Sequence, residues 1–166
     1  MNIQEIFENA KKDPTLFANI DIDELLAAVE NTKNDHLDNK TLDDISCEIY
    51  QELTELHWTQ LVLSKKASIE TLCNKLTNYR LINEIYQIHK GKHVRWIRRT
   101  NPKNTLVAGG IVLDIKFLDG GTNIVVQTTS PKCPVLQYKY DECITFQKMS
   151  HDEQLILMAY ELLTKT

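Results

Sequence analysis

The first 90 residues of the sequence contain no glycine and only one proline, Pro14. All five glycines and the other three prolines follow later in the chain. Glycine supplies the positive φ angles that tight turns and bulges need, so its absence argues against a turn-rich β domain in residues 1–89. We therefore predict that this stretch is helical and that a β-rich domain follows it.

Long apolar runs and secretory signals are also missing. No run of apolar residues approaches the length of about 18 that a membrane-spanning helix needs. The opening segment carries Glu5 and Glu8 where a secretory signal has a basic start and an unbroken apolar core. The four cysteines form no CxxC pair and indicate no disulfide framework. These absences predict a cytoplasmic protein with no membrane partner.

Motifs that carry chemistry are equally scarce. The sequence contains no dinucleotide-binding, P-loop, HExxH or GxSxG motif. His89, His93, Cys133 and Cys143 have the side chains of zinc ligands, but the spacing of the two cysteines and the Gly91 break between the histidines are atypical. We therefore predict a protein that is not an enzyme and that has no cofactor and no metal site.

The charges that are present are unevenly distributed. Residues 1–55 hold 14 acidic and 4 basic residues, whereas residues 56–166 hold 9 acidic and 15 basic residues. Such asymmetry says nothing about the fold, but it is informative about partners. The net positive charge of residues 56–166 is therefore a hint about the partners of this part of the chain.

The helical part is predicted to be dominated by residues 41–89. Thr41 is a candidate N-cap for this stretch, and Gly91 is a candidate stop signal at its end. Two short helices are expected before residue 41, near residues 2–12 and 22–31. Two alternatives fit: one long self-associating coiled coil, or a helical hairpin broken at residues 64–68. The apolar seam on which both depend comprises Leu42, Ile45, Ile49, Leu53, Leu56 and Leu63, and then Ile69, Leu72, Leu76, Tyr79 and Tyr86.

From residue 92 the apolar period changes from 3.6 to 2, which is typical of strands. Asp119-Gly120-Gly121 is a hairpin turn, and Gly109-Gly110 marks a bulge or sharp bend. Five short strands in residues 90–149 predict a small SH3-like five-stranded β-barrel. Ser150 and Glu153 form a capping box that opens a C-terminal helix in residues 150–166. The predicted fold class is therefore α+β.

The run KGKHVRWIRR, the strand GGIVLDIKFLDGG and the final strands YKYDECITFQK carry a resemblance to a known group of proteins. In these segments residues 90–149 resemble a small β-domain of uncharacterised proteins from giant DNA viruses. The resemblance implies a viral protein in the host cytoplasm or viral factory. It implies no catalytic residues.

The segment KGKHVRWIRRTNPK is the strongest candidate site, because it is rich in lysine and arginine and contains no acid. Arginine and lysine bind phosphate, and arginine also stacks on bases. The predicted nucleic-acid-binding residues are Lys90, Lys92, Arg95, Arg98, Arg99 and Lys103. The alternatives are that these cations neutralise the acidic helical part or are merely solvated, and Trp96 is expected in the core rather than as a stacking platform.

Together these patterns predict a non-enzymatic oligomeric binding protein. Residues 1–89 would form a helical oligomerisation region, and the β domain would bind DNA or RNA with little sequence preference. The alternative function is a structural scaffold or adaptor that contacts other proteins through the coiled coil and the barrel.

Overall fold

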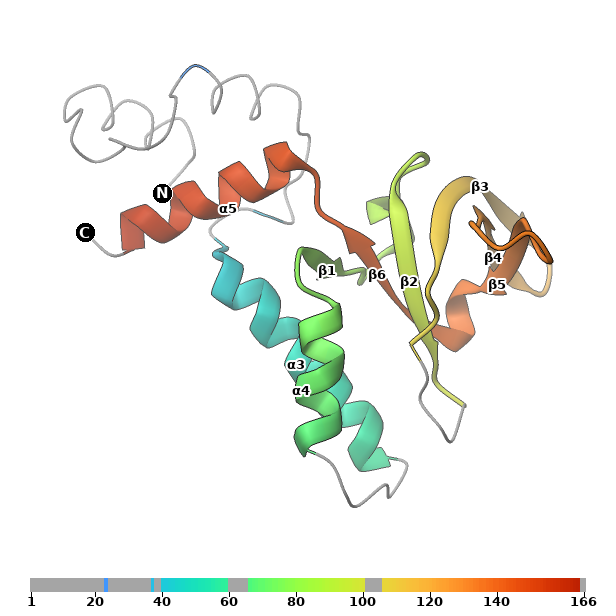
Figure 1. Ribbon diagram of the computed structural model, residues 1–166, viewed down its shortest axis with the longest axis horizontal. Helices are drawn as coiled ribbons and strands as arrows, with labels where there is room; N and C mark the ends of the chain where they lie inside the picture. The colour runs from blue at the N-terminus through green and yellow to red at the C-terminus, as the bar shows by residue number, and fades with distance from the viewer. Residues whose placement is uncertain (1–22, 24–36, 38–39, 60–65, 101–105, 165–166) are drawn as a thin grey trace. The chain divides into compact units, whose positions relative to one another are not determined.

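The computed structural model describes Asp23, Leu37 and residues 40–59, 66–100 and 106–164. These residues form three α-helices and a six-stranded antiparallel sheet, so the fold class is α+β, as predicted (Figure 1). The chain divides into two compact units, residues 1–47 with 149–166 and residues 48–148. None of the helices in the described ranges is long and apolar enough to cross a membrane.

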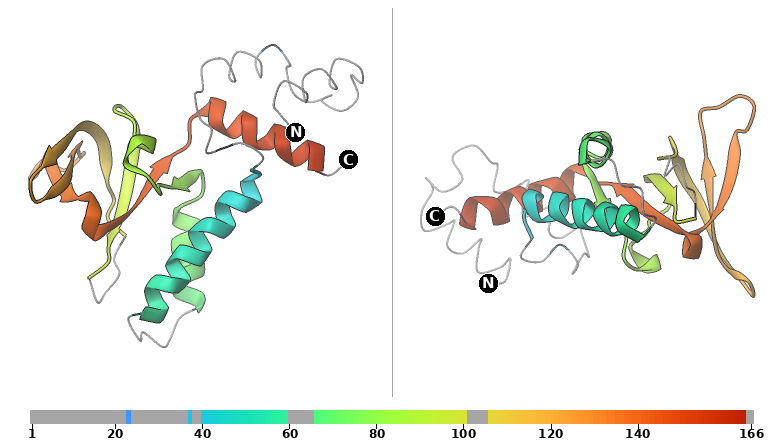
Figure 2. Two further views of the ribbon diagram at one scale, coloured as in Figure 1. Left: turned by 180° about the vertical axis from the view of Figure 1, so that it is seen from behind. Right: turned by 90° about the horizontal axis from the view of Figure 1, so that it is seen from below.

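Helix α3 spans Leu42–Thr59 and helix α4 spans Lys66–Lys75. Thr41 caps α3 as predicted: its Oγ1 accepts the Asp44 amide at 3.2 Å, and Asp44 Oδ2 accepts the Thr41 amide at 2.9 Å. The two helices lie side by side and run in opposite directions (Figures 1 and 2). The members of the predicted seam that are buried are Ile45, Ile49, Leu53, Leu56, Ile69, Leu72 and Leu76.

The prediction of one continuous long helix over residues 41–89 is wrong. Helix α4 ends at Lys75, Asn78 takes a left-handed φ of 69°, and strand β1 follows at Tyr79–Leu81. Asparagine tolerates this conformation, so it ends the helical stretch without a glycine. The hairpin alternative describes α3 and α4, although α4 is shorter than predicted. The short helices expected near 2–12 and 22–31, and residues 60–65 between α3 and α4, lie outside the described residues.

The remaining strands are β2 His93–Arg98, β3 Gly110–Leu118, β4 Gly121–Gln127, β5 Val135–Lys139 and β6 Cys143–Lys148. Their order in the sheet is β1-β6-β2-β3-β4-β5, with all neighbours antiparallel. The predicted five-stranded closed barrel is therefore wrong. The sheet has a sixth strand, β1, and it stays open because β1 and β5 end the order without pairing to each other.

One apolar cluster lies on one face of the sheet and includes an aromatic pair. The rings of Trp96 and Tyr138 are stacked with centroids 4.1 Å apart, and Trp96 is only 3% exposed, which confirms its predicted place in the core. The other buried members of this cluster are Ile82, Ile88, Val94, Val112, Ile124, Val126 and Cys143. On the opposite face of β2, Ile97 is also buried, and Arg95 Nη1 donates to the carbonyl of Lys75 at 3.2 Å, which joins β2 to the end of α4.

The unit of residues 1–47 and 149–166 contains α5, His151–Thr164. Its predicted capping box is formed, because Ser150 Oγ accepts the Glu153 amide and Glu153 Oε2 accepts the Ser150 amide, both at 3.1 Å. The helix buries the apolar side chains Leu155, Ile156, Leu157, Ala159 and Tyr160.

Candidate functional site

The structure does not gather the predicted basic residues into one surface. Arg95 projects from the face of β2 opposite Trp96, Arg98 is exposed at the end of the strand, and Arg99 follows it. Lys90 and Lys92 precede the strand, and Lys103 lies outside the described residues. The segment therefore supplies separate cations around β2 rather than a continuous basic strip.

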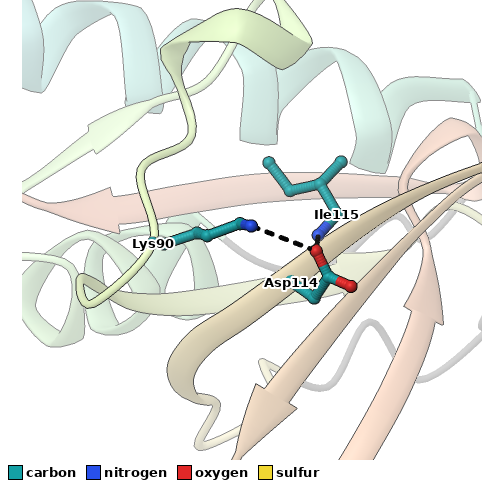
Figure 3. A network of polar contacts seen from close by, with 3 residues as sticks. All are labelled: Lys90, Asp114 and Ile115. Carbon is teal, nitrogen blue, oxygen red and sulfur yellow. Dashed lines mark hydrogen bonds and ion pairs between the residues drawn. The ribbon is translucent and has the colours of Figure 1, made fainter.

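Two of these cations are paired with carboxylates. Lys90 Nζ lies 3.2 Å from Asp114 Oδ1, which also accepts the amide of Ile115 (Figure 3). The hydrogen bond from Lys90, followed by the backbone bond from Ile115, lowers the pKa of Asp114. Arg99 Nη2 lies 3.3 Å from Glu52 Oε1 on α3. The positive charges of Lys90 and Arg99 are therefore neutralised by nearby carboxylates, which is the alternative to phosphate binding for these two residues.

Arg95 is held by neutral groups instead. Its Nε donates to the carbonyl of Val107 at 3.1 Å and its Nη1 donates to the carbonyl of Lys75 at 3.2 Å. Carbonyl oxygens orient the guanidinium but carry no net charge, so the positive charge of Arg95 is not cancelled. Within the described part of the chain its Nη2 makes no hydrogen bond and remains available to a ligand.

A second cation, Lys148 at the end of β6, belongs to the same neighbourhood. His93 lies between them, and its pKa is lowered mainly by burial and further by the positive charges of Arg95 and Lys148. His93 Nδ1 also shares a hydrogen bond of 2.9 Å with the hydroxyl of Tyr79. We call His93, Arg95 and Lys148 the basic cluster. Lys148 was not predicted from the sequence, because only the pairing of β6 with β1 and β2 brings it there.

At the opposite end of β2 lies a polar hollow of about 400 Å³, which lies wholly within the unit of residues 48–148. It opens between α3, the residues after β1, and the 3₁₀ turn η3 at Tyr140–Glu142. The hollow is lined by Glu52, Leu81, Ile82, Asn83, Arg99, Tyr140, Asp141, Cys143 and Ile144. Apart from Arg99, none of these residues was predicted to belong to a site, because they come from segments that only the fold brings together.

The titration of two lining groups reflects their surroundings. The pKa of Tyr140 is raised by burial and then by the negative charges of Glu84 and Asp141. Burial raises the pKa of the Cys143 thiol to about 11, although the positive charges of Arg98 and Arg99 act in the opposite direction. The thiolate is the reactive form, so Cys143 is a poor nucleophile at neutral pH.

This pKa leads to a prediction for alkylation by iodoacetamide. At pH 7.5 we expect Cys143 to react at least roughly 100-fold more slowly than the exposed Cys47 and Cys133, because so little of it is thiolate. Its rate should keep rising as the pH approaches about 11. Peptide mapping by mass spectrometry measures each rate, and urea-unfolded protein serves as the control. Equal rates in the folded protein would contradict the buried position of Cys143.

The described residues include no group of three or more histidine, cysteine, aspartate or glutamate side chains placed to hold a metal ion. Comparison of the chain with protein-family models, with curated proteins and with solved structures finds no match. The resemblance of residues 90–149 to a viral β-domain therefore stays a prediction. The geometry of the basic cluster carries the functional argument.

Proposed function

We propose that this protein is a non-enzymatic binding protein that holds nucleic acid by its phosphates, with little sequence preference. The observation that supports this most is the basic cluster. Arg95 lies two residues from His93 on β2, Lys148 ends the neighbouring strand β6, and neither cation has a carboxylate partner among the described residues. Cations that no acid neutralises attract a phosphate backbone and release its counterions.

Two further cations lie at the two ends of β2, outside the basic cluster. Within the described ranges, the side chains of Lys92 and Arg98 make no ion pair with any carboxylate. Lys92 precedes the strand and Arg98 ends it, and a strand of this length spans roughly 20 Å at about 3.3 Å per residue. A single strand of nucleic acid that follows β2 would meet a cation near each end.

Self-association was predicted from the apolar seam of residues 41–89. Among the described seam residues of α3 and α4, all but the half-buried Leu42 are buried within a single chain, so the described part of the seam leaves little apolar surface for a second copy. A homo-oligomer therefore stays a prediction without support from these helices, and nucleic-acid binding does not depend on it.

The proposal is tested by replacing Lys92, Arg98 and Lys148 with alanine in the full-length protein. We expect the affinity for a single-stranded oligonucleotide at about 50 mM salt to fall roughly 10- to 100-fold. The slope of log affinity against log salt should flatten by about 2, because each lost phosphate contact removes about 0.7 to 0.9. Fluorescence anisotropy over a salt series measures both quantities.

The matched control replaces Lys90, Lys116 and Lys139, which removes the same charge from exposed positions outside the proposed surface. Lys90 and Lys139 already pair with Asp114 and Glu142, so this variant should keep most of the affinity and of the salt slope. Equal losses in the two triple variants would refute the assigned surface. No binding by the wild-type protein at this salt concentration would refute nucleic-acid binding itself.

A scaffold or adaptor function is the second candidate, and one observation favours it. Large apolar side chains are exposed on β3 and β5, among them Phe117, which is 72% exposed, Leu118 and Val135. Contiguous exposed apolar patches mark protein-binding surfaces, and Phe117 and Leu118 are neighbours at the end of β3. If the scaffold function is correct, replacing Phe117 and Leu118 with serine should remove binding to a protein partner. The same variant should bind the single-stranded oligonucleotide with the affinity of the wild-type protein.

A further inference from the structure

His93 is the member of the basic cluster whose charge can change near neutral pH, because the ordinary pKa of histidine is about 6.5. Lys148 lies opposite Tyr79 in the pairing of β1 with β6. The register of β2 with β6 places His93 on the other side of Lys148. Arg95 follows two residues along β2, so its side chain is on the same face of the sheet. The inference below rests on the proposed function, because it concerns a phosphate bound at this cluster.

The hydroxyl of Tyr79 is bonded to one ring nitrogen of His93. The hydroxyl oxygen lies 2.9 Å from Nδ1, and the two rings meet edge to face with centroids 6.0 Å apart. A hydroxyl can donate and accept, so it donates to Nδ1 of the neutral imidazole and accepts from Nδ1–H of the charged one. In both states Nε2 carries a hydrogen, and Nε2 makes no hydrogen bond within the described part of the chain. Nε2–H is therefore available to a phosphate oxygen.

Positive charges face His93 in the described ranges. The charged and titratable side chains around it are Arg95 from its own strand, Lys148 from β6 and Tyr79 from β1. Strand β3 places the apolar Ile111 opposite it, and helix α4 contributes a backbone carbonyl that holds Arg95. Burial, and then the charges of Arg95 and Lys148, lowers the pKa of His93, so the ring is neutral at pH 7 in the free protein. A phosphate placed among these groups acts in the opposite direction, because a nearby negative charge favours the charged imidazole.

We propose that His93 is a phosphate ligand of the bound strand and that it takes up one proton from the solvent when the phosphate binds. In the bound state Nε2–H donates to a phosphate oxygen and Nδ1–H donates to the hydroxyl of Tyr79. A hydrogen bond from a charged imidazole is roughly twice as strong as one from a neutral ring. The affinity therefore rises as the pH falls through the pKa of the bound histidine, and it levels off below the pKa of the free one.

The test measures the affinity of the full-length protein for a thymidine oligonucleotide by fluorescence anisotropy, from about pH 8 to about pH 5. The bases of this oligonucleotide do not titrate in that range, and the label is a dye whose emission does not depend on pH. We expect the affinity to rise about 10-fold or more, because an adjacent opposite charge changes a pKa by about 1 to 3 and a change of 1 corresponds to a factor of ten. His93→Gln keeps a donor that does not titrate, so most of this rise should disappear.

His89→Gln is the matched control, because His89 is an exposed histidine of the same unit outside the basic cluster. It should keep the rise of the wild-type protein. A second measurement needs no variant: by NMR, the pKa of His93 in the wild-type protein should be higher with saturating oligonucleotide than without it. Equal pKa values in the two states, or the same pH profile for wild type and His93→Gln, would overturn the inference and leave the proposed function intact. Absence of oligonucleotide binding at every pH would overturn both.

Discussion

Replacing Gly109 with alanine should lower the free energy of unfolding by about 3 kcal/mol or more. Gly109 has a φ of 80°, which costs an alanine roughly 1–2 kcal/mol. A Cβ at this position would also lie 1.8 Å from the carbonyl oxygen of Val94, which belongs to the backbone of β2 and cannot rotate away. The two strands would have to separate, and such overpacking costs about another 1–3 kcal/mol. Urea unfolding followed by circular dichroism measures the change.

Two other glycines serve as controls that separate the causes. Gly91 has a φ of 85° but open space around it, so Gly91→Ala should show the conformational cost alone. Gly120 has open space and no left-handed φ, so Gly120→Ala should change stability by less than about 0.5 kcal/mol. If Gly109→Ala cost no more than Gly91→Ala, the close approach of Gly109 to β2 would be disproved.

The parts of the fold that the sequence predicted are those with local determinants. The Asp119-Gly120-Gly121 turn joins β3 to β4, and the caps of α3 and α5 form as their spacing indicates. Strand β1 was missed because three residues are too few to show a period of two. In addition, no glycine or proline directly before Tyr79 indicates the end of the helical stretch. Closure of the barrel was wrongly predicted because it depends on which distant strands pair, and local patterns do not specify that.

The site was only partly predictable for the same reason. Strict alternation in β2 placed Arg95 opposite Trp96, but the carbonyl oxygens that hold Arg95 come from Lys75 and Val107. The carboxylate that pairs with Arg99 in the described part of the chain belongs to Glu52, 47 positions away in the sequence. A basic segment therefore indicates where cations occur, while the tertiary structure decides which of them an acid neutralises.

Replacing Trp96 with alanine should have the largest effect of any side-chain truncation in the sheet, a loss of about 3–5 kcal/mol in the free energy of unfolding. Trp96 is 3% exposed and stacks on Tyr138, so its removal leaves a cavity and an unpartnered ring between β2 and β5. Total stabilities are typically about 5–15 kcal/mol, so this loss is a large fraction of the whole. Denaturant unfolding measures it, and Trp96→Phe, which retains an aromatic ring, should lose less.

Tyr86→Ala is the matched control, because Tyr86 is an aromatic residue of the same unit that is 71% exposed. It should change stability by less than about 0.5 kcal/mol. The comparison also decides between the two roles that an aromatic residue in a basic segment can have. A stacking platform for bases would lose nucleic-acid affinity on truncation and keep its stability. Trp96→Ala with nearly normal stability and impaired oligonucleotide binding would therefore contradict the core position. A large loss of stability instead fits a buried side chain that holds β2 against β5.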